Sequence, residues 1–224
     1  LNRLRLLVAF LFLTLAHWLI LGSPFPSQAE PHRWFWLAVS GVVGLVIGDA
    51  FLFQAFIWIG PRLSMLLMSL APIIAAVLAW VIFGETLSLA QLAGVVVTLS
   101  GVGWVVLERN GKSRPHDLDA GHFYRGILFG LGGATGQAVG LVTARLGAGG
   151  DFSALSGTLM RMLSALIVLW AVTLIQRQVG STFRQLAARP QALIFILAGA
   201  FTGPFIGVTL SLICLLYTSP SPRD

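Results

Sequence analysis

Long apolar runs separated by short polar gaps cover almost the whole chain of 224 residues. A helix needs about 20 mainly apolar residues to cross the hydrocarbon core of a bilayer. We expect seven runs to be membrane-spanning helices: residues 4–22, 35–58, 63–83, 89–107, 124–146, 155–175 and 192–213. The runs do not alternate apolar and polar residues as the strands of a membrane barrel do. The pattern therefore predicts an all-α, polytopic transmembrane helix bundle.

The composition supports a membrane protein and narrows the range of partners. Apolar residues make up 57% of the chain and charged residues only 10%, whereas soluble domains have about 25% charged residues. The net charge is +6, but the basic residues lie between the apolar runs, where Lys and Arg orient membrane helices. We expect a lipid bilayer as partner and no nucleic acid. The single cysteine, Cys214, excludes an intrachain disulfide and a cysteine-based metal cluster.

Two segments far apart in the chain share a pattern of glycines. Residues 37–51 read LAVSGVVGLVIGDAF, and residues 196–210 read ILAGAFTGPFIGVTL. A shift of 159 residues aligns two pairs of glycines, Gly44 with Gly203 and Gly48 with Gly207. The two predicted helices are five apart in order, so they cross the membrane in opposite directions. Inverted repeats of this kind are typical of secondary transporters.

The stretch LAPIIAAVLAWVIFGETLS has a proline, Pro72, near its start and a Gly-Glu pair, Gly84 and Glu85, near its end. Three glycines follow in the next run: Gly94, Gly101 and Gly103. This string resembles the fourth and fifth helices of EamA-type transporters in the drug/metabolite transporter superfamily. The resemblance implies a fold of ten helices, formed by two inverted five-helix repeats.

The resemblance also implies a division of the chain. Residues 1–107 would be the first repeat without its first helix, and residues 124–213 the second repeat without its last two helices. Residues 108–123 would be the loop between the repeats. We therefore expect the sequence to be a fragment, truncated at both ends.

Both ends of the chain have a second interpretation. The last residues, 214–224, read CLLYTSPSPRD and back-translate to a transposon-end adapter of sequencing libraries. We expect this segment to be a sequencing artefact, and a genuine polar tail is the alternative. At the other end, NRLR before an apolar stretch, with SQA before Glu30, is also typical of a cleaved secretory signal.

Physical arguments assign roles to three positions beside the resemblance. Pro72 lacks an N–H and frees a carbonyl four residues earlier, so we expect a kink in the helix over 63–83. The kink serves either a central cavity or packing alone. Glu85 lies at the interface and is expected to cap the start of the next helix. Gly136 belongs to a small-residue stripe on the helix over 124–146, which lets helix backbones approach closely.

A few polar side chains lie within the apolar runs, where each is costly unless it is paired or faces water. The candidates for substrate or proton binding are Asp49, Gln54, His17, Gln137 and Arg161. Asp49 is the main candidate, since an acid at this depth suits a proton site. A buried structural hydrogen bond is the alternative for Asp49, and Arg161 has the alternative of extending to the lipid headgroups.

The resemblance implies a secondary transporter, most simply a proton-driven exporter of small organic metabolites such as amino-acid-like compounds. It would lie in the bacterial inner membrane as a monomer or homodimer. The chain has no HExxH or GxSxG motif and no two carboxylates in one apolar run, so we expect no enzymatic activity, no metal and no cofactor. A membrane-embedded enzyme or a non-transporting assembly subunit is the alternative.

Overall fold

The computed structural model describes residues 2–85, 87–112, 120–150, 152–177, 180 and 191–218. Helices joined by short connections make up this part of the chain, which contains no strand. Six helices in it are long and apolar enough to cross a membrane. The predicted all-α, polytopic bundle is therefore confirmed. The predicted inter-repeat loop and the proposed artefact lie partly outside the described residues, at positions 113–119 and 219–224.

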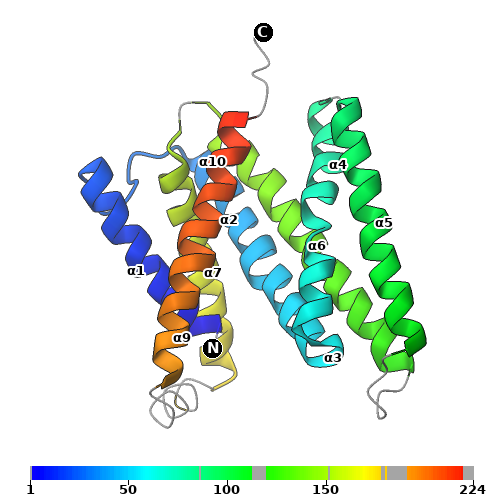
Figure 1. Ribbon diagram of the computed structural model, residues 1–224. Coiled ribbons are helices and arrows are strands. Elements are labelled where there is room, and N and C mark those ends of the chain that lie inside the picture. The colour runs from blue at the N-terminus through cyan, green and yellow to red at the C-terminus, as the bar shows by residue number, and fades with distance from the viewer. Residues whose placement is uncertain are drawn as a thin grey trace. The chain divides into compact units, whose positions relative to one another are not determined.

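The described elements follow one another along the chain as coloured in Figure 1. They are α1 (Asn2–Leu21), α2 (Pro31–Gly41), η1 (Val42–Gly48), α3 (Asp49–Met68), α4 (Ala71–Phe83), α5 (Leu89–Lys112), α6 (Ala120–Ala148), α7 (Ala154–Ile175), α9 (Gln191–Ala200), η2 (Phe201–Gly207) and α10 (Val208–Thr218). The segments η1 and η2 are π-helical. The chain divides into two compact units, unit 1 (Leu1–Val42 and Thr143–Asp224) and unit 2 (Val43–Val142).

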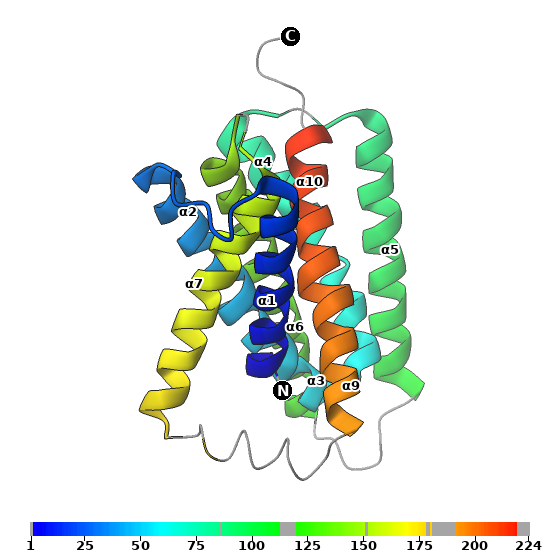
Figure 2. The same ribbon diagram turned by 90° about the vertical axis from the view of Figure 1, so that its left-hand side faces the viewer.

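Helix α7 is the central helix of unit 1. It packs against α1, α2 and α10, while α1 also contacts α9 and η2, so that α1 lies between α7 and the continuous rod of α9, η2 and α10 (Figure 2). Residues 156–162 of α7 are all buried, although they cover every side of the helix. A helix that is buried all round lies inside a bundle and not at its edge.

Unit 2 is built around α3 and α6. Ala55, Ile59, Leu63 and Leu67 of α3 form a core with Val102 of α5 and Ala134 of α6. A second cluster joins Ala75 of α4 to Ala138 and Val142 of α6. Small residues on α6 thus meet larger side chains of α3 and α4, which is how membrane helices pack when no water drives them together.

The sequence predicted one helix over residues 63–83, but the structure has two helices in this run. The backbone of α3 leaves helical geometry at Gly60 (φ +79°, ψ +163°), directly before Pro61. Helix α3 then ends at Met68, and α4 begins at Ala71 with Pro72 in its first turn. Proline is favoured there because a first-turn N–H has no partner within the helix. The predicted kink at Pro72 is therefore wrong: Pro72 starts a helix, and the bend lies at Gly60.

Two caps set the turn between α4 and α5. Helix α4 ends at Gly84, whose left-handed conformation (φ +68°) lets its N–H donate to the carbonyl of Trp80 at 3.0 Å. Helix α5 begins with a capping box, in which Ser88 Oγ accepts from the N–H of Gln91 and Gln91 Oε1 accepts from the N–H of Ser88. The capping role expected of Glu85 stays a prediction.

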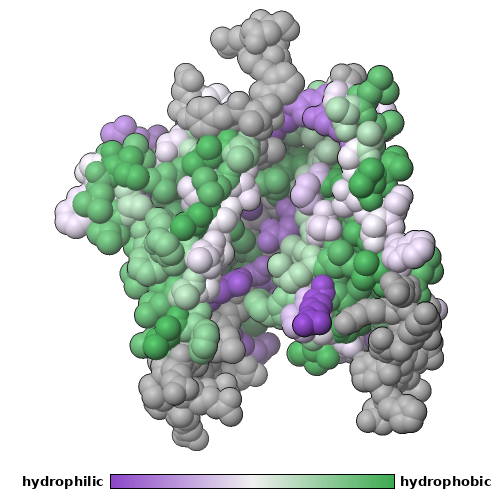
Figure 3. Space-filling view, in the orientation of Figure 1, coloured by the Kyte–Doolittle hydropathy of each residue, from purple (hydrophilic) through white to green (hydrophobic). Residues whose placement is uncertain are grey.

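Much of the described surface is apolar (Figure 3). On α5, for example, Leu89, Val97 and Trp104 are 87%, 72% and 73% exposed. A side chain added at Gly94 or Gly101 would meet no described atom within 4 Å. Exposed apolar surface of this extent requires a lipid or protein neighbour, and it fits a helix that faces the bilayer.

Candidate functional site

The five predicted polar candidates divide between the two units. Asp49, Gln54 and Gln137 belong to unit 2, and His17 and Arg161 belong to unit 1. Three are buried, with exposed fractions of 4% for Asp49 and 2% for both His17 and Arg161, whereas Gln54 and Gln137 are half-buried. Each unit therefore has its own candidate site.

His17 fastens α1 to α7 within unit 1. Its Nδ1 lies 2.6 Å from the carbonyl oxygen of Ser23, and its Nε2 lies 2.9 Å from the hydroxyl oxygen of Ser156. A carbonyl only accepts, so Nδ1 is the donor, and in the neutral ring Nε2 accepts from Ser156. Because protein groups engage both ring nitrogens, His17 has a structural role in this conformation.

Arg161 lies where α7 crosses α2. A Cβ atom added at Gly41 would overlap the carbonyl oxygen of Arg161, so the two backbones touch at this point. The Arg161 side chain is buried, and its Nε and Nη1 have no hydrogen-bond partner among the described residues. The 2% exposure of Arg161 does not support the alternative that its side chain extends to the headgroups.

The buried acid of unit 2 follows directly on a close helix crossing. A Cβ atom added at Gly136 would lie 2.8 Å from the Cα of Gly48, and one added at Gly48 would lie 3.2 Å from the backbone nitrogen of Gln137. The close approach predicted for the small-residue stripe at Gly136 is therefore present. Asp49 is the first residue of α3, immediately after η1. A π-helical segment often marks a functional position in a helix.

Unit 2 contains an apolar groove that the sequence did not predict. It has a volume of about 550 Å³ and lies between η1 and α3 on one side and α6 on the other. Its lining is Val43, Ile47, Phe51, Leu128, Phe129, Leu131, Gly132, Thr135, Gly136 and Val139. The groove can accept hydrocarbon but offers no charge. Its only sequence signal was the small-residue stripe on α6, which leaves room for larger neighbours.

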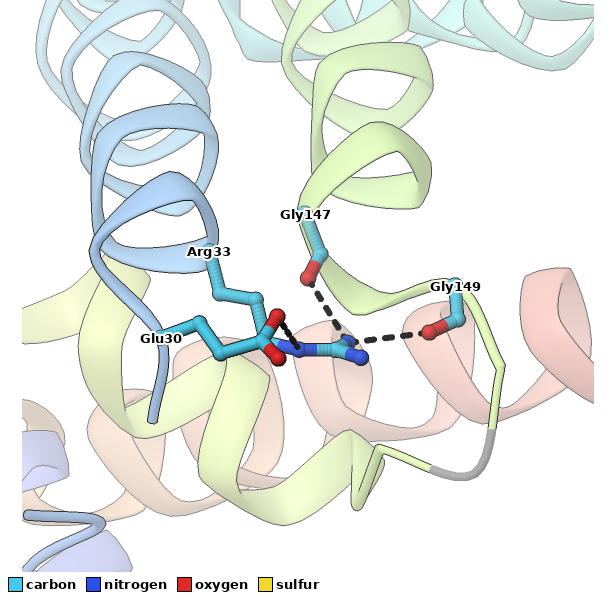
Figure 4. A network of polar contacts seen from close by, with 4 residues as sticks. All are labelled: Glu30, Arg33, Gly147 and Gly149. Carbon is cyan, nitrogen blue, oxygen red and sulfur yellow. Dashed lines mark hydrogen bonds and ion pairs between the residues drawn. The ribbon is translucent and has the colours of Figure 1, made fainter. Parts of the chain in front are cut away.

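A second feature missed by sequence reasoning is a polar clamp around Arg33 (Figure 4). Nη1 of Arg33 donates to the carbonyl oxygens of Gly147 at 3.3 Å and Gly149 at 2.9 Å, and Nε lies 3.5 Å from Glu30. The guanidinium also lies 4.8 Å from the ring centre of Phe152. Arg33 thus donates to carbonyls at the C-terminal end of α6. A cation at this end of a helix also interacts favourably with the helix dipole.

The comparisons with known proteins agree with these features. Residues 1–107 match the EamA-like transporter family. Neither the comparison with curated proteins nor that with solved structures gave a match. The matched residues contain α1 to α4 together with η1, the buried Asp49 and most of α5. By this match the first 107 of the 224 residues are similar to the EamA-like transporter family, whose members are transporters of the drug/metabolite type.

Proposed function

We propose that the protein is a proton-coupled exporter of small organic metabolites, and that Asp49 is its proton-binding residue. The family indicates a transporter, and the observation that carries the finer proposal is the burial of Asp49 within a membrane-spanning helix. Ionisable residues inside membrane helices are rare and mark ion and proton pathways. The proposal assigns no enzymatic activity to the protein.

The surroundings of Asp49 suit a residue whose protonation changes a helix position. It follows η1, and the preceding Gly48 touches the backbone of α6. A π-helical segment has a looser hydrogen-bond pattern than an α-helix, so it can change length by one residue. Gain or loss of a charge beside such a segment shifts the balance between two helix arrangements, as alternating access requires.

We also propose that residues 1–107 and 124–213 are two inverted repeats. Both π-helical segments are seven residues long, and they begin 159 residues apart, at Val42 and Phe201. This is the shift that aligns the glycines in the sequence. The repeated irregularity supports the repeat, because a π-helical segment is rare and its recurrence at one shift is not a consequence of hydropathy.

The test is transport by the purified, complete protein in proteoliposomes, with a radiolabelled amino-acid mixture as probe. The asparagine variant Asp49→Asn removes the titratable group and keeps the shape, so we expect it to abolish accumulation driven by a pH gradient. Exchange of labelled for unlabelled probe needs no gradient and should persist. Asp49→Glu should retain part of the driven transport, with a shifted pH optimum.

The matched control is Glu30→Gln, which removes an acid whose side chain is 73% exposed. This variant should keep gradient-driven accumulation. Full accumulation by Asp49→Asn would show that Asp49 is a structural hydrogen-bond acceptor, and the proton-site proposal would be wrong. Transport unaffected by a pH gradient in the parent protein would exclude proton coupling altogether. We place the protein in the bacterial inner membrane, where such a gradient exists, as a monomer or homodimer.

A further inference from the structure

Arg161 differs from the other buried polar residues of unit 1 because its donors are unsatisfied. The hydroxyl of Thr158 donates to the carbonyl of Ala154, and that of Thr173 to the carbonyl of Leu169. His17 and Ser156 form a hydrogen bond with each other. Nε and Nη1 of Arg161 have no hydrogen-bond partner among the described residues. Of the described buried side chains in unit 1, Arg161 is the one charged group with such nitrogens and no other interaction.

An unpaired, buried guanidinium is not a stable arrangement by itself. Removing the charge from water is costly, and an attraction to an opposite charge is the usual compensation. Arginine stays protonated in proteins, so it cannot escape the cost by becoming neutral. An anion that pairs with Arg161 during part of the protein's working cycle would offset this cost.

The residues of α7 that share a stripe with Arg161 have small side chains. Ala154, Thr158, Arg161 and Ala165 are buried and lie along one stripe of the helix at helical spacing. Long helical side chains lean toward the N-terminal end of their helix. The guanidinium is therefore expected to lean toward Thr158, one turn earlier, whose side chain is small. The position lies inside a helix that is long and apolar enough to cross a membrane.

We propose that Arg161 binds the carboxylate of the transported molecule. One guanidinium balances the single charge of a carboxylate, and its planar donors match the two carboxylate oxygens. Since Arg161 is 2% exposed, the site is closed in this conformation, and substrate reaches it when the helices around α7 separate. This inference rests on the proposed export function and names the chemical class of its substrates: small organic acids, amino acids included.

The test compares acids with their amides in an exchange assay without a proton gradient. Proteoliposomes containing the complete protein are loaded with unlabelled compound, and uptake of the labelled compound is measured. The probes are leucine, threonine, phenylalanine and benzoate, each paired with its own amide. We expect at least one acid to exchange about tenfold or more faster than its amide, since a charge-assisted pair is lost with the carboxylate.

Two substitutions and a matched control assign the preference to Arg161. Arg161→Gln should remove the difference between acid and amide. Arg161→Lys should keep part of this difference, because lysine retains the positive charge but lacks the planar pair of donors. The control Arg62→Gln removes an exposed arginine and should leave the preference unchanged. If Arg161→Gln does not fold, the parent protein and Arg161→Lys still decide the outcome.

Several results would overturn the proposal. These are equal exchange of acids and amides, exchange of none of the acids, or an acid preference that survives Arg161→Gln. Thermal unfolding adds a separate readout: the preferred acid should raise the melting temperature and its amide should not. A similar rise on addition of chloride, without any acid preference, would identify an inorganic anion. Since exchange needs no gradient, the result does not depend on whether transport is proton-coupled.

Discussion

The two π-helical segments, η1 and η2, have the same length and the same spacing between their glycines. They differ in how deeply their residues are buried. In η1, Gly44, Leu45 and Gly48 are buried, and the helix touches α6 through Gly48. In η2 the only buried residue is Pro204, and a side chain added at Gly203 would meet no described atom within 4 Å. The same backbone irregularity thus occurs once with its glycines buried against a neighbouring helix, and once with most of its residues exposed or half-buried.

The residues that follow the two segments differ as well. Asp49 comes after η1 and is buried, whereas Val208, which is half-buried, comes after η2. A proline gives η2 a local reason for its irregularity, since Pro204 has no N–H to donate. No proline lies in η1. The comparison indicates that η1 is maintained by its packing, and that the acid occurs at the more deeply buried of the two positions.

Moving the acid to the other copy should have the largest effect. Val208→Asp places a carboxylate in an open region of a membrane helix, which costs about 2.5 to 3.5 kcal/mol on translocon-insertion scales. We expect the helix over 191–218 to insert much less efficiently in a glycosylation-reporter assay. Asp49→Val, the reverse change, should insert at least as well as the parent. Equal insertion of Val208→Asp and the parent would show that η2 is shielded as well as η1.

Enlarging the glycine at the packed crossing should have the next largest effect. Gly136→Val adds three carbon atoms where a Cβ already lies 2.8 Å from the Cα of Gly48. Overpacking of this kind costs about 1 to 3 kcal/mol. We expect a lower melting temperature for the purified variant in detergent, whereas Gly203→Val should leave it nearly unchanged. Similar losses in both variants would mean that η2 is also covered by a neighbour.

The contrast between the two segments also shows what the sequence could predict. Hydropathy alone identified the six helices that are long and apolar enough to cross a membrane, because a helix satisfies every backbone polar group within a bilayer. The small-residue stripe indicated the close approach at Gly136, and the glycine repeat paired the two segments that contain η1 and η2. It did not indicate their π-helical form, because backbone irregularity leaves no trace in hydropathy.

Other features depended on three-dimensional neighbours and were out of reach. The run over 63–83 is uniformly apolar, so its interruption at Ser69 and Leu70 has no hydropathy signal. The sequence marked Asp49 and Arg161 as unusual for their surroundings but did not show which helices cover them. The burial of Arg161 follows from the central position of α7 in unit 1. The Arg33 clamp joins residues more than one hundred positions apart and was missed.

The smallest effect is expected from replacing the proline of η2 by the residue at the same place in η1. The change is Pro204→Leu, since position 204 corresponds to Leu45 under the shift of 159 residues. The new N–H permits a regular α-helix, which gains about one backbone hydrogen bond, or about 0.5 to 1.5 kcal/mol. A regular helix also rotates α10 by about 100°, because it removes the extra residue of the π-helical turn.

That rotation would expose Leu212, which is fully buried in the core of unit 1 with Leu37 and Ala148. Exposing a leucine to water costs about 1.5 to 3 kcal/mol; toward lipid the cost is smaller, but the contacts with α7 are still lost. We expect these contacts to prevail, so that η2 remains π-helical in Pro204→Leu with little change in stability. The measurement is oxygen accessibility of nitroxide labels at Ser211 and Leu212, in the parent and the variant. We expect high oxygen accessibility at the exposed Ser211 and low accessibility at Leu212 in both proteins. If the two values are exchanged in the variant, the proline alone maintains η2. In that case η1 and η2 have different causes.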